Sequence, residues 1–465
     1  MKQHRIHIRW YILADILICL VTWLSFYYLR TQFYTYPFSM PPGFYLGLGL
    51  YTAGWLFLHF LTGTYKPLYE KSRLGEMIRT SLVILSGCLV LLFVFILKNP
   101  QEHNRNYYLE FASLLIPLWT LTITTRMLFL GIAKKQLRQK KVFFNAVLIG
   151  SGKRAEQFYH DFIHAREHSG FRIIAFFNIN GSQPSTLNNI LQSFNGLDAL
   201  PDFISSEQVE EVIIAIDKNE RGLITSVLQQ LSDREVNIKI MPDTVDIITG
   251  ALHTNNVLGI PLIDIHSGML PDWQQNIKRV IDIVVSLTGL IILSPLLLYT
   301  MIRVALSSKG TVIFKQERIG FKGRPFTMYK FRSMMMDAEK EGPRLSHEED
   351  KRITGWGKTM RKWRLDELPQ LWNILVGEMS LVGPRPERKY YIDQIVIQHP
   401  EYKYLFKVKP GLTSWGMVKF GYASSVEEMV QRMPFDLLYV ENVSLALDFK
   451  IMFYSIQIIL AGKGK

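Results

Sequence analysis

The chain has 465 residues, 48% of them hydrophobic, and a formal net charge of +13. This length predicts about three domains. The apolar residues form blocks long enough to span a bilayer, so we interpret the positive charge as attraction to anionic lipids or phosphorylated substrates, not to nucleic acid. Cys19 and Cys88 both lie inside apolar blocks, which argues against a disulfide framework or a zinc site.

Four apolar segments open the chain, at residues 10–29, 44–62, 78–97 and 109–132. Each is close to the roughly 20 residues that a helix needs to cross the hydrocarbon core of a bilayer. Asp15 and Arg126 fall near segment ends, from which their side chains could reach the interface. Lysine and arginine concentrate before the first segment, between the second and third, and after the fourth. Both ends of this bundle are therefore predicted to face the cytoplasm.

Residues 142–259 alternate strand-like and helix-like segments, which is typical of a Rossmann-like α/β domain. The first expected strand runs into the turn Gly150-Ser151-Gly152-Lys153-Arg154-Ala155, whose spacing suits phosphate binding at a helix N-terminus. A dinucleotide site also needs an acidic residue after the second strand, where this sequence has Asn178. Two interpretations stay open: a structural domain whose glycines serve packing, and a domain that binds a nucleotide or another small ligand.

A further apolar stretch covers about residues 277–306 and is interrupted by Ser294 and Pro295. Proline removes a backbone hydrogen bond and clashes with the preceding turn, so a kink is expected there. The hydroxyl of Ser294 could bond one of the freed carbonyls. One interpretation is a fifth spanning helix. Basic residues at both ends of the stretch favour a re-entrant helix that enters and leaves at the cytoplasmic face.

The region after this helix is rich in glycine, arginine and paired carboxylates. Asp366 and Glu367 precede Pro369, which suits the first position of a helix that Gly377 can end. One carboxylate could attack phosphorus and the other could bind a hard divalent cation. A carboxylate pair before a helix more often only stabilises the helix dipole. Neighbouring basic residues favour a phosphate site instead, and these are Lys330, Arg332, Arg361 and Arg385.

Several motifs resemble, in the same order, those of the bacterial sugar transferases, the polyprenyl-phosphate hexose-1-phosphate or monotopic phosphoglycosyl transferases. They are Lys278-Arg279 with Asp282 and Ser294-Pro295, Lys330-Phe331-Arg332-Ser333-Met334, Leu365-Asp366-Glu367-Leu368-Pro369-Gln370, Gly383-Pro384-Arg385-Pro386-Glu387, Lys409-Pro410-Gly411-Leu412-Thr413, and the later Tyr439, Ser444 and Asp448. The likeness to the catalytic unit covers about Ile260 to the C-terminus, and the preceding regions resemble the large, multi-domain members. Trp415 is followed by Gly416-Met417-Val418, where many members continue with small-Gln-Val, so the sugar or nucleotide preference stays open.

The resemblance implies a membrane protein in three parts: a four-helix transmembrane region at 1–141, the Rossmann-like domain, and an α-rich cytoplasmic catalytic domain at 260–465 with the re-entrant helix. It implies that Asp366 attacks the β-phosphate of a UDP-sugar, releases UMP, and passes the phosphosugar to undecaprenyl phosphate. Glu367 would help to bind Mg²⁺. The residues implied to contact phosphates are Lys330, Arg332, Arg361 and Arg385.

The implied setting is the cytoplasmic face of a bacterial inner membrane, in contact with its lipids, at the start of exopolysaccharide, capsule or O-antigen lipopolysaccharide assembly. We also expect a homodimer, with the middle domain serving assembly. An NAD-dependent nucleotide-sugar dehydratase or epimerase would explain the glycine turn, but no tyrosine has lysine four positions later, as those enzymes typically require. A non-enzymatic membrane scaffold with a ligand-sensing α/β domain would not need Asp366 and Glu367 among arginines.

Overall fold

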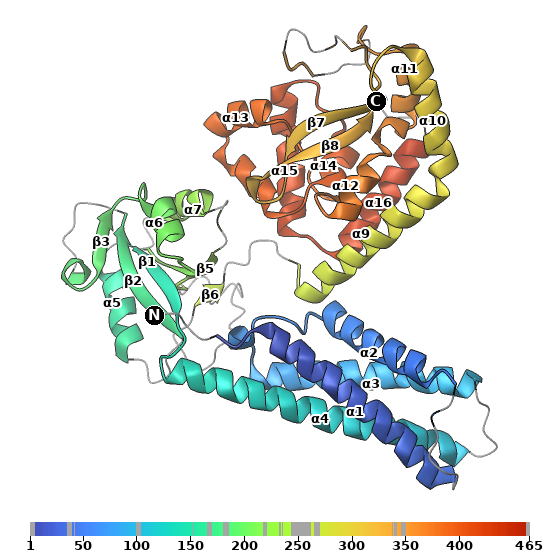
Figure 1. Cartoon of the computed structure of the whole chain (residues 1–465). Coiled ribbons are helices and arrows are strands. Elements are labelled where there is room, and N and C mark those ends of the chain that lie inside the picture. Colours follow the sequence, from blue (N-terminus) through green and yellow to red (C-terminus); the bar gives the residue numbers. More distant parts are fainter. Residues whose placement is uncertain are drawn as a thin grey trace. The chain divides into compact units, whose positions relative to one another are not determined.

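The computed structural model describes residues 5–34, 40, 42–98, 104–150, 152–164, 170–179, 186–216, 221–231, 234, 236–242, 262–264, 270–336, 338, 342–345 and 350–461. Contacts between Cα atoms divide the chain into two compact units. The first consists of Met1–Phe144, Arg166–Phe171 and Pro271–Ile277, and the second of Asn145–Ala165, Arg172–Leu270 and Lys278–Lys465. Figure 1 shows the helical, α/β and mixed regions that follow one another along the chain.

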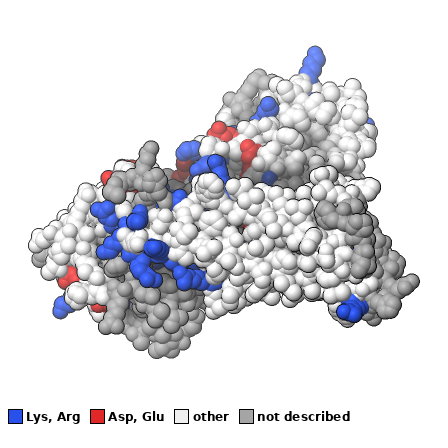
Figure 2. All heavy atoms as spheres, turned by 60° about the horizontal axis from the view of Figure 1, so that its bottom comes forward, with Lys and Arg blue, Asp and Glu red and all other residues white. Residues whose placement is uncertain are grey.

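The first unit is built on four helices, α1 (Ile8–Tyr34), α2 (Phe44–Leu61), α3 (Arg73–Lys98) and α4 (Asn104–Arg138), with the short helix η1 (Leu68–Glu70) before α3. Each of the four is long and apolar enough to cross a membrane, which confirms the four expected segments. Their shared core combines aliphatic side chains with aromatic ones, which include Trp23, Phe26 and Trp55. In Figure 2 the flanks of the helices are largely uncharged, and basic side chains gather near one end of the bundle.

Four ionisable side chains are buried together in this helical unit. Arg126 Nη2 lies 3.1 Å from Asp15 Oδ2, and its Nη1 lies 3.5 Å from Glu76 Oε1. Lys71 Nζ donates to the same Glu76 oxygen at 3.1 Å. The expectation that Asp15 and Arg126 extend toward an interface is therefore wrong, because each side chain points into the bundle and is neutralised there by a partner from another helix. We refer to Asp15, Lys71, Glu76 and Arg126 as the bundle cluster.

The α/β region has a six-stranded sheet in the order β3-β2-β1-β4-β5-β6. The strands are β1 (Phe144–Gly150), β2 (Phe171–Asn178), β3 (Gln192–Asn195), β4 (Glu211–Ala215), β5 (Asn237–Ile240) and β6 (Ile263–Asp264). The helices are α5 (Gly152–His164), α6 (Leu200–Ser206) and α7 (Arg221–Gln230). The pairs β2–β3, β1–β4 and β4–β5 are parallel, and the pair β5–β6 is antiparallel. The strands β2, β1, β4 and β5 are neighbours at the centre of the sheet, and this alternation of strands and helices confirms the expected α/β domain.

The glycine turn after β1 is packed tightly against the neighbouring strand. A Cβ on Gly150 would lie 2.2 Å from the carbonyl oxygen of Ala215, so only glycine fits where β1 meets β4. Arg154, in the first turn of α5, donates to the carbonyls of Met241 at 3.2 Å and Pro242 at 2.8 Å. A guanidinium thus occupies the carboxyl edge of the sheet, where an open α/β domain receives its ligands. Ser151 of the turn lies outside the described residues. Both observations support the structural interpretation of this domain.

The last region begins with α9 (Asp272–Ile292) and α10 (Ser294–Ser307), which are bent by 63° relative to each other. The break falls where Ser294 and Pro295 predict it. Pro295 lies in the first turn of α10, and Ser294 Oγ donates to the carbonyl of Ile291 at 2.7 Å. The structure therefore confirms the predicted kink and the predicted hydrogen bond from the Ser294 hydroxyl to a backbone carbonyl.

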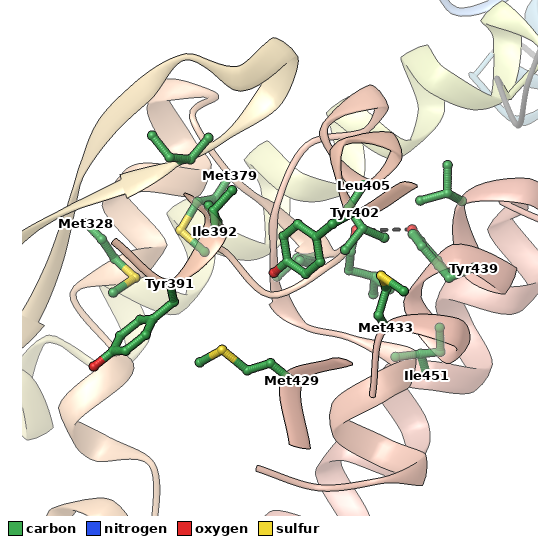
Figure 3. Close-up of a cluster of buried hydrophobic side chains, with 14 of the residues drawn as sticks. Met328, Met379, Tyr391, Ile392, Tyr402, Leu405, Met429, Met433, Tyr439 and Ile451 are labelled. Carbon is green, nitrogen blue, oxygen red and sulfur yellow. Dashed lines mark hydrogen bonds between the residues drawn. The ribbon is translucent and has the colours of Figure 1, made fainter. Parts of the chain in front are cut away.

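The remaining elements form the region that carries the Asp366–Glu367 pair. A hairpin of β7 (Ile313–Ile319) and β8 (Pro325–Phe331), joined through η4 (Phe321–Gly323), precedes α11 (Gly355–Lys362), η5 (Leu365–Glu367) and α12 (Gln370–Val376). Then follow β9 (Ser380–Val382), α13 (Lys389–Gln398), η6 (Pro400–Lys407), β10 (Gly411–Thr413), α14 (Trp415–Lys419), α15 (Val426–Glu441) and α16 (Leu445–Leu460). Figure 3 shows part of their core, in which Met328, Met379, Met429 and Met433 pack with Tyr391, Tyr402 and Tyr439.

Polar contacts attach α9 to this core. Arg279 donates to the carbonyls of Ile374 at 2.6 Å and Leu375 at 2.7 Å, near the C-terminus of α12, where a cation is stabilised by the helix dipole. Lys278 Nζ lies 2.5 Å from Asp448 Oδ2, and Asp448 also accepts from the Tyr439 hydroxyl at 2.7 Å. These motif residues therefore hold the bent helix against the part of the chain that carries the carboxylate pair.

Candidate active site

The carboxylate pair lies in a tight turn directly before α12. Asp366 and Glu367 belong to η5, and the described structure places Pro369 at the start of α12 and Gly377, with φ 95°, at its end, as the sequence predicts. Both carboxylates are buried, with 8% and 7% of their surfaces exposed. Arg364, which begins the turn, has φ 58°, a left-handed conformation that is uncommon outside glycine.

Glu367 is held by three cations. Its Oε1 lies 3.1 Å from Lys330 Nζ and 3.6 Å from Arg385 Nη2, and its Oε2 pairs with Arg364 Nη1. Burial works to raise the pKa of Glu367, but the charges of Lys330, Arg364 and Arg385 outweigh it and hold this pKa well below its usual range. Glu367 is therefore a fixed anion at neutral pH.

Asp366 is the contrasting member of the pair. Among the described residues no hydrogen bond or ion pair within 4 Å holds its carboxylate, although Lys330, Arg361 and Arg364 lie close enough to lower its pKa. Burial and the negative charge of Glu367 outweigh these cations and raise the pKa of Asp366 above its ordinary value. A buried carboxylate with a raised pKa and no fixed partner is a better nucleophile than one locked in ion pairs.

The structure brings most of the predicted phosphate-binding residues to this pair. Lys330 comes from β8, and Arg385 comes from the loop after β9. Arg361, at the end of α11, acts electrostatically on Asp366 and donates from Nε to Ser333 Oγ at 3.0 Å. Three elements that are distant in sequence thus meet around η5.

Arg332 is placed differently from the other predicted residues. It follows β8 and is 5% exposed, and its Nη2 donates to the carbonyl of Ser308, just after α10, at 2.6 Å. Its Nε and Nη1 have no hydrogen-bond partner among the described residues. The side chain is therefore directed at the end of the bent helix and makes no contact with the carboxylates of Asp366 or Glu367.

A second buried ion cluster supports the loop that carries Arg385. Glu387 accepts from Arg318 Nη1 at 2.8 Å and from Arg432 Nη2 at 2.9 Å. Arg432 Nε lies 3.7 Å from Asp436 Oδ2, and the other Asp436 oxygen accepts from the backbone N–H of Gly416 at 2.9 Å. The arginines hold the pKa of the buried Glu387 below its usual value. Of this loop cluster, sequence reasoning reached only Glu387, as part of a motif.

Asp366 and Glu367 are also the residues that could bind a divalent metal ion. No group of three or more His, Cys, Asp or Glu side chains is placed to hold a metal ion in the part of the chain that the structure describes. Mg²⁺ does not need one, because it keeps several waters and binds through one or two carboxylates together with substrate phosphates. Asp366 and Glu367 therefore fit an ion that arrives with a diphosphate, provided that Glu367 exchanges one of its cation partners for it.

Comparison with known proteins adds to this geometry. The family model described as bacterial sugar transferase matches residues 273–462, and the model described as CoA-binding domain matches residues 61–242. The Bacillus subtilis protein named as the uncharacterized sugar transferase EpsL is 37% identical over 188 residues, which cover 40% of this chain and 89% of that protein. The chain belongs to the bacterial sugar transferase family.

Two further relatives of this family member have names that state a reaction. An Aeromonas hydrophila UDP-N-acetylgalactosamine-undecaprenyl-phosphate N-acetylgalactosaminephosphotransferase is 42% identical over 40% of this chain and 44% of that protein. A Salmonella typhimurium undecaprenyl-phosphate galactose phosphotransferase is 28% identical over 90% of this chain and 87% of that protein. The chain spans about half the length of several curated relatives that it matches, with shares between 44% and 61%.

Proposed function

We propose that this sugar transferase is a phosphoglycosyl transferase that moves a sugar-1-phosphate from a UDP-sugar to undecaprenyl phosphate and releases UMP. The observation that carries the proposal is the asymmetry of the buried pair. Glu367 is fixed by three cations, and Asp366 has no ion pair or hydrogen bond among the described residues. The names of the relatives support the same reaction class.

In the first step the carboxylate of Asp366 attacks the β-phosphorus of the donor. A bond forms between an Asp366 oxygen and phosphorus, and the bond from that phosphorus to the oxygen of UMP breaks, with its electron pair leaving on UMP. In the second step a phosphate oxygen of undecaprenyl phosphate attacks the same phosphorus, and Asp366 leaves as a carboxylate. The two steps balance without a proton transfer, so this chemistry needs no general base.

The basic residues have a defined part in both steps. Lys330, Arg364 and Arg385 pair with Glu367, and Arg361 acts electrostatically on Asp366, so that among these described residues the basic groups outnumber the two carboxylates. These cations offset the repulsion between the Asp366 carboxylate and the incoming diphosphate, and they stabilise charge on the departing UMP. A bound Mg²⁺ would add further charge neutralisation on the diphosphate, with Glu367 as its protein ligand.

The membrane arrangement belongs to the same proposal. The four long helices span a bacterial inner membrane, and the bent pair α9 and α10 enters and returns on the cytoplasmic face, so that donor and carrier lipid meet at one surface. The 63° bend supports a helix that turns back. The product would start exopolysaccharide, capsule or O-antigen repeat units. We further propose a homodimer, which a molecular mass measured by light scattering in lipid particles tests directly.

The decisive experiment follows UMP release in lipid discs that contain Mg²⁺, undecaprenyl phosphate and a panel of UDP-sugars. The wild-type chain is compared with Asp366→Asn and with Asp393→Asn, which changes an exposed aspartate that pairs with Lys389 on the surface of α13. We expect UMP from at least one donor with the wild type and Asp393→Asn, and none with Asp366→Asn. Release that survives Asp366→Asn would remove the covalent mechanism, and no release from a folded wild type would remove the activity.

A further inference from the structure

Tyr422 connects two of the cations that hold Glu367. Tyr422 lies in the segment of the chain that joins α14 to α15, and the guanidinium carbons of Arg364 and Arg385 lie 4.6 Å and 4.9 Å from its ring centroid. Both arginines also pair with Glu367. Tyr422 lies outside every motif described above, and the proposed mechanism assigns it no task.

The two cation–π contacts, with Arg364 and Arg385, are the interactions that hold the Tyr422 side chain in place. Cations within about 6 Å of an aromatic centroid are attracted by the ring quadrupole, and the attraction grows when the pair is shielded from water. The hydroxyl oxygen of Tyr422 is buried and has no hydrogen-bond partner among the described residues. The ring, and not the hydroxyl, therefore makes the contacts that two neighbouring guanidiniums need to stay close together.

Arg364 in particular requires support from its surroundings. A residue other than glycine in the left-handed region is strained and persists only where neighbouring contacts hold it. Arg364 has φ 58° and ψ 21°, and its buried Nε has no partner among the described residues. The contacts that fix its guanidinium are the ion pair with Glu367 and the Tyr422 ring. Because Arg364 starts the turn that contains Asp366, its conformation sets the direction of the nucleophile.

Arg385 is held from the same stretch of chain. Its Nη1 lies 3.4 Å from the sulfur of Met417, in α14, while the Tyr422 ring contacts its guanidinium. Met417 lies in the segment where the sequence departs from the family pattern, and Tyr422 follows only five residues later. The departure therefore falls on a surface that packs against an active-site arginine.

We propose that Tyr422 is a positioning residue of the active site, whose ring keeps Arg364 and Arg385 on Glu367 and so leaves Asp366 without a cation partner and free to attack. Without the ring, either arginine can swing toward Asp366 and pair with the nucleophile. This role rests on the proposed phosphosugar transfer for its kinetic consequence, and it has a conformational consequence that holds whatever the reaction is.

The kinetic test compares Tyr422→Leu, which removes the ring, with Tyr422→Phe, which keeps it. A matched control is Tyr404→Leu, because the Tyr404 ring also contacts a cation, Lys407, whose Nζ lies 3.8 Å from the ring centroid, and no ion pair or hydrogen bond joins Tyr404 to Asp366 or Glu367 within the described structure. We expect kcat for UMP release to fall about tenfold or more in Tyr422→Leu, with a smaller change in KM. Tyr422→Phe and Tyr404→Leu should stay within about threefold of the wild type. An equal loss in Tyr422→Phe, or no loss in Tyr422→Leu, overturns the proposal.

Hydrogen exchange gives a measurement that does not depend on activity. In the full chain in lipid discs, backbone amides of residues 364–371 should exchange faster in Tyr422→Leu than in the wild type, and Tyr422→Phe should match the wild type. Tyr422→Gln serves as a second variant without the ring if the leucine variant does not fold. Unchanged exchange in the variants without the ring overturns the positioning role. If the folded wild type releases no UMP, the proposed function fails, and the exchange data still decide the role of Tyr422.

Discussion

The molecule buries charge in two regions, and the two regions are built differently. The bundle cluster contains two acids and two bases, each close to an opposite charge, so its formal charges cancel. Around Asp366 and Glu367 there are four bases for two acids, and one of the acids has no ion partner in the described structure. In a cluster with equal numbers of acids and bases the charges neutralise one another. A cluster with surplus bases needs an anion from a ligand to neutralise it.

This difference has a physical basis. Removing a charge from water costs several kcal/mol unless a partner compensates it, so a structural cluster is stable only when it is balanced. The loop cluster follows the same rule, since Arg318 and Arg432 match Glu387 and Asp436. The surplus of positive charge around the pair at η5 is therefore the property that supports its proposed role as a substrate site. A diphosphate would supply the missing negative charge.

The largest effect is expected when the unbalanced region loses its nucleophile. Asp366→Asn should lower the rate of UMP release by at least about a thousandfold, because the other carboxylate of the turn, Glu367, is held by three cations and cannot replace it. Its thermal midpoint should match or exceed that of the wild type, since a buried, unpaired charge has been removed. A differential scanning measurement beside the kinetic assay checks both. A strongly destabilised Asp366→Asn would show that this acid also has a structural task.

In the bundle cluster we expect a loss of stability without a loss of activity. Arg126→Met should destabilise the protein by about 3–5 kcal/mol, because Asp15 and Glu76 lose their shared partner while they stay buried. The fraction that remains folded should keep the kcat of the wild type. Thermal unfolding in lipid discs, with activity normalised to folded protein, measures the two quantities. A stable Arg126→Met with a much lower kcat would contradict the division into structural and substrate-binding clusters.

The long helices and the helix break could be predicted from the sequence, because each depends on residues that are close together in the chain. Apolar block length gave the four helices, and Ser294 with Pro295 gave the break between α9 and α10. The bundle cluster was missed because its pairs join residues as distant as Asp15 and Arg126. Arg332 was grouped with the site by its motif and by the basic residues around it, and the structure shows its side chain bonded to the carbonyl of Ser308 after α10.

The active site was predictable only in part for a related reason. Asp366, Glu367 and the basic motifs were identified by their residue types, which chemistry restricts. Tyr422 carried no such signal, because an aromatic ring acquires its effect on a cation only from tertiary placement. Arg364 in the left-handed region was equally hidden, since sequence does not forecast strain at an arginine.

A smaller effect should follow from straightening the bent helix. In Pro295→Ala the missing N–H is restored and the clash is removed, so α9 and α10 should approach one continuous helix. We expect UMP release to fall about tenfold, because Lys278 and Arg279 anchor the helix to the core around α12. A cysteine placed near the C-terminus and tested for labelling from each side of the membrane reports the orientation. Cytoplasmic labelling with full activity would mean that the kink is dispensable.

The smallest expected effect is on the pH dependence of activity, and it distinguishes the role of Asp366 from that of Glu367. Asp366 must be ionised to attack, and burial together with the charge of Glu367 raises its pKa. Activity should therefore be lost, as pH falls, at a higher pH than an ordinary aspartate would give. Glu367→Gln removes the neighbouring negative charge and frees Lys330 and Arg364 to stabilise the Asp366 carboxylate. The acid limb of kcat/KM should then move to lower pH, even though the plateau rate is reduced.

Comparing the shape of each profile, scaled to its own plateau, isolates this shift from the loss of rate. Asp393→Asn, which changes an exposed carboxylate, should leave the limb in place. A limb that moves upward in Glu367→Gln would mean that Glu367 lowers the pKa of Asp366, for example by holding the cations near it. In that case Glu367 would hold the cations where they lower the pKa of Asp366. The two acids would then titrate together as a coupled pair, and Asp366 would not be a free nucleophile beside a fixed anion.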